Sequence, residues 1–183
     1  MTTQSRATIE DLYHAPDNTK AEIVNGELVL MSPVGDWPNR AAGAIYVSLR
    51  QYEPKTTGGR AYTDNVGFKV RLPNRESLSP DVSFYMGQST GMKFLEGAPV
   101  FAVEVRSEGG YGPIAEQAIA DKRADYFAAG TLVVWDLDLL GPEVIKVYRA
   151  ADPENPTVYR RGEIAEADPA VPGWRIPVDD LFG

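Results

Sequence analysis

The sequence contains no cysteine and a single histidine among its 183 residues. Without cysteine the chain has no disulfide bond and no thiolate metal site, which fits a reducing compartment. The histidine, His14, lies near the N-terminus, where we expect a surface role rather than a catalytic one. Glycine-rich phosphate loops, nucleophile elbows and zinc signatures of the HExxH type are also missing. These absences exclude the enzyme classes that depend on such motifs.

Long apolar runs are missing as well. No stretch approaches the roughly 20 apolar residues that a membrane-spanning helix needs. The first residues, MTTQSRATIEDLYH, have no apolar core of the signal-peptide type. We therefore expect no membrane partner and a cytoplasmic location.

Basic residues are outnumbered by acidic ones. The chain has 18 Lys and Arg against 26 Asp and Glu, which gives a formal net charge of −8. Proteins that bind nucleic acid non-specifically usually present a basic surface, so this balance argues against tight, non-specific DNA binding. It does not argue against a metal-dependent nuclease, because clustered carboxylates are what hold the metal.

The remaining composition is that of a globular protein, with 43% hydrophobic and 24% charged residues. The length predicts one domain over residues 1–183. The order of strand and helix patterns predicts an α/β (α+β) fold: a mixed central β-sheet flanked by helices, with an N-terminal β-hairpin. The expected elements are a capped helix over 8–13, a hairpin around Asn25-Gly26, a helix from Asp36 to Glu53, one or two strands within 61–72, a polar loop over 73–80, strands over 81–86 and 100–106, a helix from Pro113 to Gly130, two strands joined through 138–142, and short β pieces that end in the turn DDLF.

The helix that follows Pro113 carries a lysine on its apolar face. Ala115, Ile119 and Tyr126 recur at helical spacing and form one stripe. Lys122 falls inside this stripe, three residues after Ile119 and four before Tyr126. Its amine must therefore either extend to solvent or meet an anion.

The strand VFAVEVR carries a glutamate in its interior. Glu104 shares its face with Ala102 and Arg106. The side chains of Phe101, Val103 and Val105 point the opposite way. An unpaired carboxylate in such a strand is unfavourable. Glu104 is therefore expected either to form an ion pair with Arg106 or Lys122, or to bind a cation.

The strand DVSFYM begins with a second carboxylate, Asp81, on the face opposite Val82 and Phe84. Alone, this aspartate is best explained as a turn or capping residue. Together with Glu104 it offers hard oxygen ligands on neighbouring strands, which suit Mg²⁺ or Mn²⁺. Such a metal polarises a phosphodiester, and the Lys122 ammonium would stabilise the transition state or orient a water. We expect the two carboxylates to lie about 4–5 Å apart, within reach of one ion.

Four ordered runs carry a resemblance to a known family: AEIVNGELVLMSP, SPDVSFY, VFAVEVRSE and DKRADYFAAGTLVVWDLD. They resemble the Uma-two family of endonucleases, which belongs to the PD-(D/E)XK nuclease superfamily and has a restriction-endonuclease-like fold. The resemblance covers roughly Thr8 to Arg149, and the tail PGWRIPVDDLF is similar to the family's ending.

This resemblance implies a Mg²⁺- or Mn²⁺-dependent endonuclease that acts on DNA. The PD dipeptide ends at Asp81, and Glu104 matches the acidic residue of the (D/E)XK half-motif. Arg106 stands where that motif has lysine; it cannot act as a base, but it can bind phosphate. Lys122 matches a lysine that the family takes from the following helix. Glu22, in the hairpin, matches a further acidic residue that completes the metal shell.

Two other interpretations stay open. The chain could be a non-catalytic interaction or regulatory module that keeps the nuclease fold, which the acidic composition and Arg106 favour. It could also be a structural domain in which Glu104 and Lys122 form only a buried ion pair. A homo-oligomer is compatible with all three interpretations.

Two further groups of residues have competing explanations. Asp136 and Asp138 are spaced like metal ligands on one strand face, but a strand end followed by a turn explains them better. Trp37, Trp135 and Trp174 are able to stack on nucleobases, although packing in the core explains Trp135 better.

Overall fold

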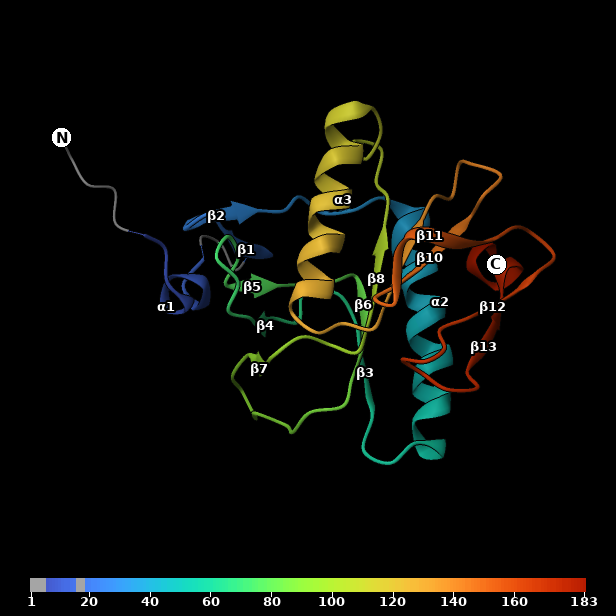
Figure 1. The fold of residues 1–183 in the computed structure, drawn as a ribbon, viewed down its shortest axis with the longest axis horizontal. Coiled ribbons are helices and arrows are strands. Elements are labelled where there is room, and N and C mark those ends of the chain that lie inside the picture. Colours follow the sequence, from blue (N-terminus) through green and yellow to red (C-terminus); the bar gives the residue numbers. More distant parts are fainter. Residues whose placement is uncertain (1–5, 16–18) are drawn as a thin grey trace.

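A six-stranded mixed sheet forms the centre of the computed structural model, which describes residues 6–15 and 19–183 (Figure 1). The strand order is β11-β10-β9-β8-β6-β3. β8 and β9 run parallel, whereas the other neighbours are antiparallel. The prediction of a mixed central sheet is therefore confirmed. Its strands are β3 (Arg60–Tyr62), β6 (Val82–Tyr85), β8 (Phe101–Val105), β9 (Val133–Leu137), β10 (Ile145–Arg149) and β11 (Asp152–Tyr159).

Strand β8 lies in the interior of this sheet, with β6 and β9 as its neighbours. Val103 and Val105 are buried on the face that meets the larger core, while Ala102 is buried on the opposite face. The alternation read from VFAVEVR thus holds on both sides of the sheet. Its apolar density also correctly predicted a central strand with the strand that follows Asp81 as its neighbour.

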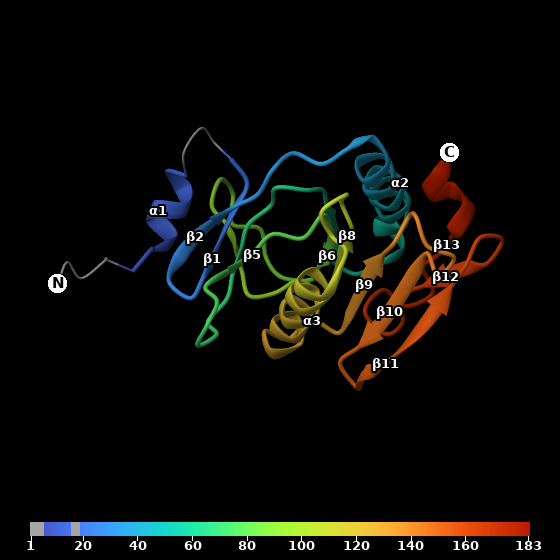
Figure 2. The same cartoon turned by 90° about the horizontal axis from the view of Figure 1, so that it is seen from above.

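Helix α2 (Asp36–Tyr52) covers one face of the sheet, and Figure 2 shows it opposite α3. Ala41, Ile45 and Leu49 recur every four residues and have no exposed surface. This stripe packs against the inward side chains of β6, β8 and β9. A 3₁₀ turn, η2 (Glu53–Lys55), ends the helix where the sequence predicts.

Helix α3 (Pro113–Ala128) covers the other face and connects the parallel strands β8 and β9. Parallel neighbours require such a crossover, so the topology itself places this helix on the sheet. Pro113 is the first helical residue, and Gly130 follows the C-cap with φ +105°. Tyr126, on its inner stripe, is completely buried.

The N-terminal hairpin forms as predicted. β1 (Ala21–Val24) pairs antiparallel with β2 (Glu27–Leu30). Asn25 and Gly26 both have positive φ, 52° and 78°, as a type I′ turn requires. The register is therefore the one that places Glu22 and Val29 opposite each other.

The short N-terminal helix α1 (Ile9–Tyr13) also begins as predicted. The Thr8 hydroxyl accepts a hydrogen bond from the Asp11 N–H, and the Asp11 carboxylate accepts one from the Thr8 N–H. This reciprocal pair is a capping box. The His14 side chain is 74% exposed, in agreement with a surface role.

The smaller elements are a three-stranded sheet, one strand pair and one terminal turn. They are the sheet of β5 (Ser77–Leu78), β4 (Phe68–Lys69) and β7 (Leu95–Glu96), the pair β12 (Ile164–Glu166) and β13 (Arg175–Pro177), and the 3₁₀ turn η3 (Val178–Phe182).

None of the helices within residues 6–15 and 19–183 combines the length and apolar character required to cross a membrane.

The segment 73–80 differs from the polar loop that the sequence predicts. It contains β5, and Ser77 and Leu78 are buried. The Ile23 N–H donates to Ser77 Oγ at 2.8 Å, and the Glu76 N–H donates to the Ile23 carbonyl at 3.1 Å. The polar residues of this segment therefore satisfy buried groups of β1, a role that composition alone does not reveal.

The core on the α2 side contains a cluster of three aromatic rings that yields a stability prediction. Trp174 is 2% exposed, and its ring centroid lies 5.3 Å from Trp135 and 5.8 Å from Phe101. Trp174→Ala should lower the free energy of unfolding by about 3–5 kcal/mol, because it leaves a large cavity. Trp37→Ala is the matched control: Trp37 is 58% exposed, so the change should be within about 0.5 kcal/mol. Urea denaturation measures both, and equal losses would contradict this assignment of the core.

Candidate active site between the central sheet and helix α3

Asp81 and Glu104 lie on adjacent strands of the central sheet. Asp81 immediately precedes β6, and its N–H donates to the Val103 carbonyl at 3.0 Å. The Val105 N–H in turn donates to Asp81 Oδ2 at 2.8 Å. These two bonds anchor the Asp81 carboxylate beside the strand segment that carries Glu104. The structure thus brings together the two acidic residues that the sequence singled out.

Lys122 points from α3 towards these strands. Its Nζ lies 2.9 and 3.0 Å from the two Glu104 oxygens and 3.1 Å from Glu22 Oε1. The side chain is only 18% exposed, so the lysine meets anions rather than extending to solvent. Burial acts to lower the pKa of Lys122, but the carboxylates of Glu104 and Glu22 outweigh it and raise that pKa above its ordinary value.

Glu104 has a second partner on the same helix face. The Tyr126 hydroxyl, one helical turn beyond Lys122, donates a hydrogen bond to Glu104 Oε1. Burial, and then the nearby Glu104 carboxylate, raise the pKa of Tyr126 well above its ordinary value, so the phenol keeps its proton. The inner stripe of α3 therefore presents both an ammonium and a hydroxyl to one carboxylate.

Glu22 enters the cluster from β1 and is 2% exposed. One of its oxygens accepts the Ser79 N–H at 2.8 Å, and the other pairs with Arg75. The Arg75 guanidinium also binds Asp125 of α3 through Nε, at 2.6 Å. This buried chain of charges connects the hairpin, the segment 73–80 and the helix.

Lys20 completes the cluster, although the sequence did not single it out. Its Nζ lies 3.1 Å from Asp81 Oδ1 and also pairs with Asp64. Burial acts to lower the pKa of Lys20, but Asp81, Glu104 and the hydrogen bond to Asp64 outweigh it and raise the pKa. The available signal was its spacing, because Lys20 is two residues before Glu22 and so shares its face on an extended chain.

Arg106 is held away from this cluster. Its guanidinium binds Asp136 through Nε at 2.8 Å and Nη2 at 2.7 Å, and it also pairs with Glu116. The side chain is 7% exposed. Asp136 pairs in register with Glu104 on the neighbouring strand, so it captures the arginine on the same face. Asp138 accepts the N–H groups of Leu140 and Gly141, as expected for a turn residue.

The charges of the cluster do not balance. If every group is ionised, five carboxylates face three cations, which leaves two negative charges in excess. Burial, and the proximity of Asp81 and Glu22, raise the pKa of Glu104, while Lys122 acts to lower it. The carboxylates are those of Glu22, Asp64, Asp81, Glu104 and Asp125, and the cations are Lys20, Arg75 and Lys122.

This donor set is chemically suited to a hard divalent cation. Carboxylate oxygens are the preferred protein ligands of Mg²⁺ and Mn²⁺. In the part of the chain that the structure describes, no three His, Cys, Asp or Glu side chains converge as a ready-made metal cage. The ammonium groups of Lys20 and Lys122 bridge the carboxylates instead. Mg²⁺ in particular is usually bound through one or two carboxylates and several waters, so a cage of three is not required.

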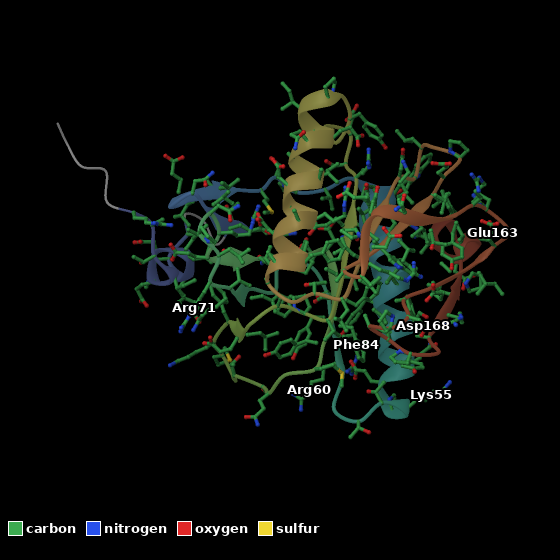
Figure 3. The ribbon with its side chains drawn as sticks, in the orientation of Figure 1. Lys55, Arg60, Arg71, Phe84, Glu163 and Asp168 are labelled. Atoms are coloured by element: carbon green, nitrogen blue, oxygen red, sulfur yellow. The ribbon has the colours of Figure 1, made fainter. Side chains whose placement is uncertain are left out.

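The buried chain of charges leads to a prediction about stability. Arg75→Met should lower the free energy of unfolding by about 3–5 kcal/mol, because Glu22 and Asp125 would lose their shared partner while remaining buried. Arg175→Met is the control. Arg175 pairs with the exposed Asp168, at the end of the molecule opposite the hairpin (Figure 3), and such a pair contributes about 0–1 kcal/mol. Similar losses in urea denaturation would refute the structural role assigned to Arg75.

Comparison with known proteins identifies the fold and the family of the chain. A solved structure from Anabaena variabilis, described as "a putative nuclease belonging to DUF820", superposes with a TM-score of 0.75 over 96% of this chain and 97% of that chain. The sequence identity is 15%, so this likeness shows a shared fold. No curated protein matches the chain. The model of the Uma2 family, described as "Putative restriction endonuclease", matches residues 7–179, and the chain therefore belongs to the Uma2 family.

Proposed function

We propose that this protein is a metal-dependent endonuclease that hydrolyses phosphodiester bonds in DNA. The observation that carries the proposal is the contact of Lys122 with Glu104 beside Asp81, on adjacent central strands, within a cluster that has five carboxylates and only three cations. A purely structural ion pair would not need more carboxylates than cations around it. Membership of the Uma2 family and the nuclease-like fold support the same reaction class.

Asp81 and Glu104 are the proposed metal ligands. Asp81 is anchored by the Val105 N–H through Oδ2, so its other oxygen, now bound to Lys20, is the one available to a cation. A bound Mg²⁺ or Mn²⁺ would polarise the scissile phosphodiester and lower the pKa of an attacking water. Both lysines would then exchange carboxylate contacts for contacts with the substrate.

Lys122 is the proposed transition-state residue. Its ammonium stays charged, since its pKa is raised by the acidic neighbours despite burial. The two carboxylates hold the ammonium at the site before substrate binds, and it can then stabilise the charge that develops on phosphate. Tyr126 keeps Glu104 oriented while the lysine moves.

Glu22 and Arg106 have more restricted roles. Glu22 is a candidate third ligand by family resemblance, but Ser79, Arg75 and Lys122 already occupy its oxygens. These contacts favour a function in positioning Lys122. Arg106 is proposed to assist through its one remaining N–H donor at the edge of the site, since Asp136 and Glu116 accept the other four.

DNA is the proposed substrate because the family description names a restriction endonuclease. The net charge of −8 makes sequence-independent binding to the DNA backbone unfavourable. We therefore expect binding to depend on divalent metal and on local contacts around the site.

The role of Lys122 can be tested by substitution. Lys122→Met should reduce DNA cleavage by about 100- to 1000-fold, because one preorganised transition-state contact is lost, while Mn²⁺ affinity stays nearly unchanged. Lys146→Met, which removes a lysine of β10 paired with Glu143, should cleave like wild type. A nicking assay and Mn²⁺ titration calorimetry provide the two measurements. If a folded, metal-binding Lys122→Met variant cleaves DNA at the wild-type rate, the lysine is not catalytic.

Asp81→Asn tests the metal site separately. It should weaken Mn²⁺ binding at least about tenfold, because an anionic ligand is replaced by a neutral amide. Asp179→Asn, at an exposed pair with Arg161, is the control and should bind Mn²⁺ normally. If wild type neither binds Mn²⁺ nor cleaves any nucleic acid, the non-catalytic module becomes the correct account.

A further inference from the structure

We propose that a cavity beside the candidate active site, the Trp37 pocket, binds one unpaired nucleobase of the DNA substrate. The Trp37 pocket has a volume of about 590 Å³, and Trp37, Tyr111, Asp36, Glu108 and Arg106 are among its lining residues. Its size lies within the range of about 300–1,000 Å³ that is usual for small-molecule sites. The proposal rests on the nuclease function. It adds that the enzyme binds DNA in a form that has an unpaired base.

The position of the pocket connects it to the reaction site. Arg106 and Ser107 line it, and they follow Glu104 by two and three residues. At the rise of an extended strand, Arg106 is about 7 Å from Glu104 along the chain. The connection from β2 to α2 runs past the same end of β8 and supplies Pro33 and Gly35 to the wall (Figures 1 and 2). A nucleotide in the pocket would therefore lie close to the scissile phosphate.

The aromatic residues of the pocket are unusually accessible. Trp37 is 58% exposed and Tyr111 is 38% exposed, whereas Trp135 and Trp174 are almost completely buried. Trp37 occupies the first turn of the long helix α2, directly before Pro38, so its backbone is rigidly placed. An exposed indole at a cavity has its ring face available, and stacking on an aromatic side chain is how proteins commonly hold unpaired bases.

Tyr111 forms a preorganised part of the pocket wall. Its hydroxyl donates to Asp138 Oδ1 at 2.8 Å, and the Arg106 guanidinium carbon lies 5.9 Å from its ring centroid. Asp138 lies in the turn after β9, and Arg106 also binds Asp136 of β9. The loop that carries Tyr111 is therefore connected both to β9 and to that turn. The ring does not need to be ordered by the ligand, which reduces the entropic penalty of binding.

The charges of the pocket favour a base over a phosphate. Asp36 and Glu108 contribute carboxylates, while the positive charge of Arg106 is compensated by Asp136 and Glu116. Carboxylates repel phosphate, but they accept hydrogen bonds from exocyclic amino groups such as that of cytosine. A neutral planar ligand with N–H donors is the chemistry that this combination recognises.

A second cavity adjoins the Trp37 pocket and adds two arginines to the residues around Trp37. It has a volume of about 320 Å³, shares Asp36, Trp37 and Leu139 with the Trp37 pocket, and is lined by Arg40 and Arg161. Both arginines contact protein acceptors and retain further N–H donors. These remaining donors can contact the sugar-phosphate chain while the base enters the Trp37 pocket. Because a base inside a duplex is stacked on its neighbours, the substrate must be single-stranded here or release one base.

The test measures binding without cleavage, in a buffer that contains Ca²⁺ in place of Mg²⁺ or Mn²⁺. The probes are a 12-nucleotide single-stranded DNA of mixed sequence and a strand of equal length whose residues are all abasic. We expect the base-containing strand to quench the emission of the exposed tryptophan and to bind wild type at least fivefold more tightly than the abasic strand. Trp37→Ala should weaken binding of the base-containing strand about 5- to 100-fold, while Trp37→Phe, which keeps a ring, should lose less.

Val47→Ala is the matched control, since Val47 is 53% exposed on the same helix and is not part of the pocket lining. Its affinity should equal that of wild type. Equal binding of the abasic and base-containing strands, equal binding by wild type and Trp37→Ala, or preference for a 12-nucleotide RNA over DNA would each overturn the proposal. Failure of the nuclease function is distinguishable, because base-dependent binding would persist without cleavage in Mn²⁺.

Discussion

The ammonium of Lys122, held between Glu104 and Glu22, is the interaction on which the arrangement of the molecule depends. It joins α3, the central strand β8 and the hairpin strand β1, which belong to three different parts of the chain. Burying either carboxylate without a positively charged partner would be energetically unfavourable, so the lysine makes their burial possible. The Arg75 guanidinium repeats the same solution between Glu22 and Asp125. Stability and the candidate site are therefore supported by one network of charges.

The central strand serves two purposes because its side chains alternate. Val103 and Val105 pack towards α2, while Glu104 faces α3. The apolar side gives the strand a fixed position in the core, and that position determines where the carboxylate lies. A site built on an interior strand is more rigid than one built on a loop, which suits chemistry that depends on preorganised groups. Trp37 differs from these core residues, because its ring is held in place by a helix without being buried.

Periodicity within single elements was enough to predict several features. The helical stripe identified Lys122, the strand alternation identified Glu104, and the Asn25-Gly26 turn was recognised from its residue types. Glu22 required the family resemblance, because nothing in its local pattern marks it. The partners Lys20 and Arg75 were missed, since they belong to irregular segments, and their contacts join residues 44 or more positions apart. The burial of segment 73–80 was missed for the same reason.

The distance in sequence between the members of the charge network also has a kinetic consequence. Lys122 and Glu22 are separated by one hundred residues, and the chain between them must be ordered before they meet. The hairpin and the helices consist of local contacts that can form early, whereas the charged centre closes a very long loop. The centre should therefore assemble near the end of folding, after the core of β8 and β9 is in place. Substitutions within it would then act mainly by accelerating unfolding and would change the rate of folding little.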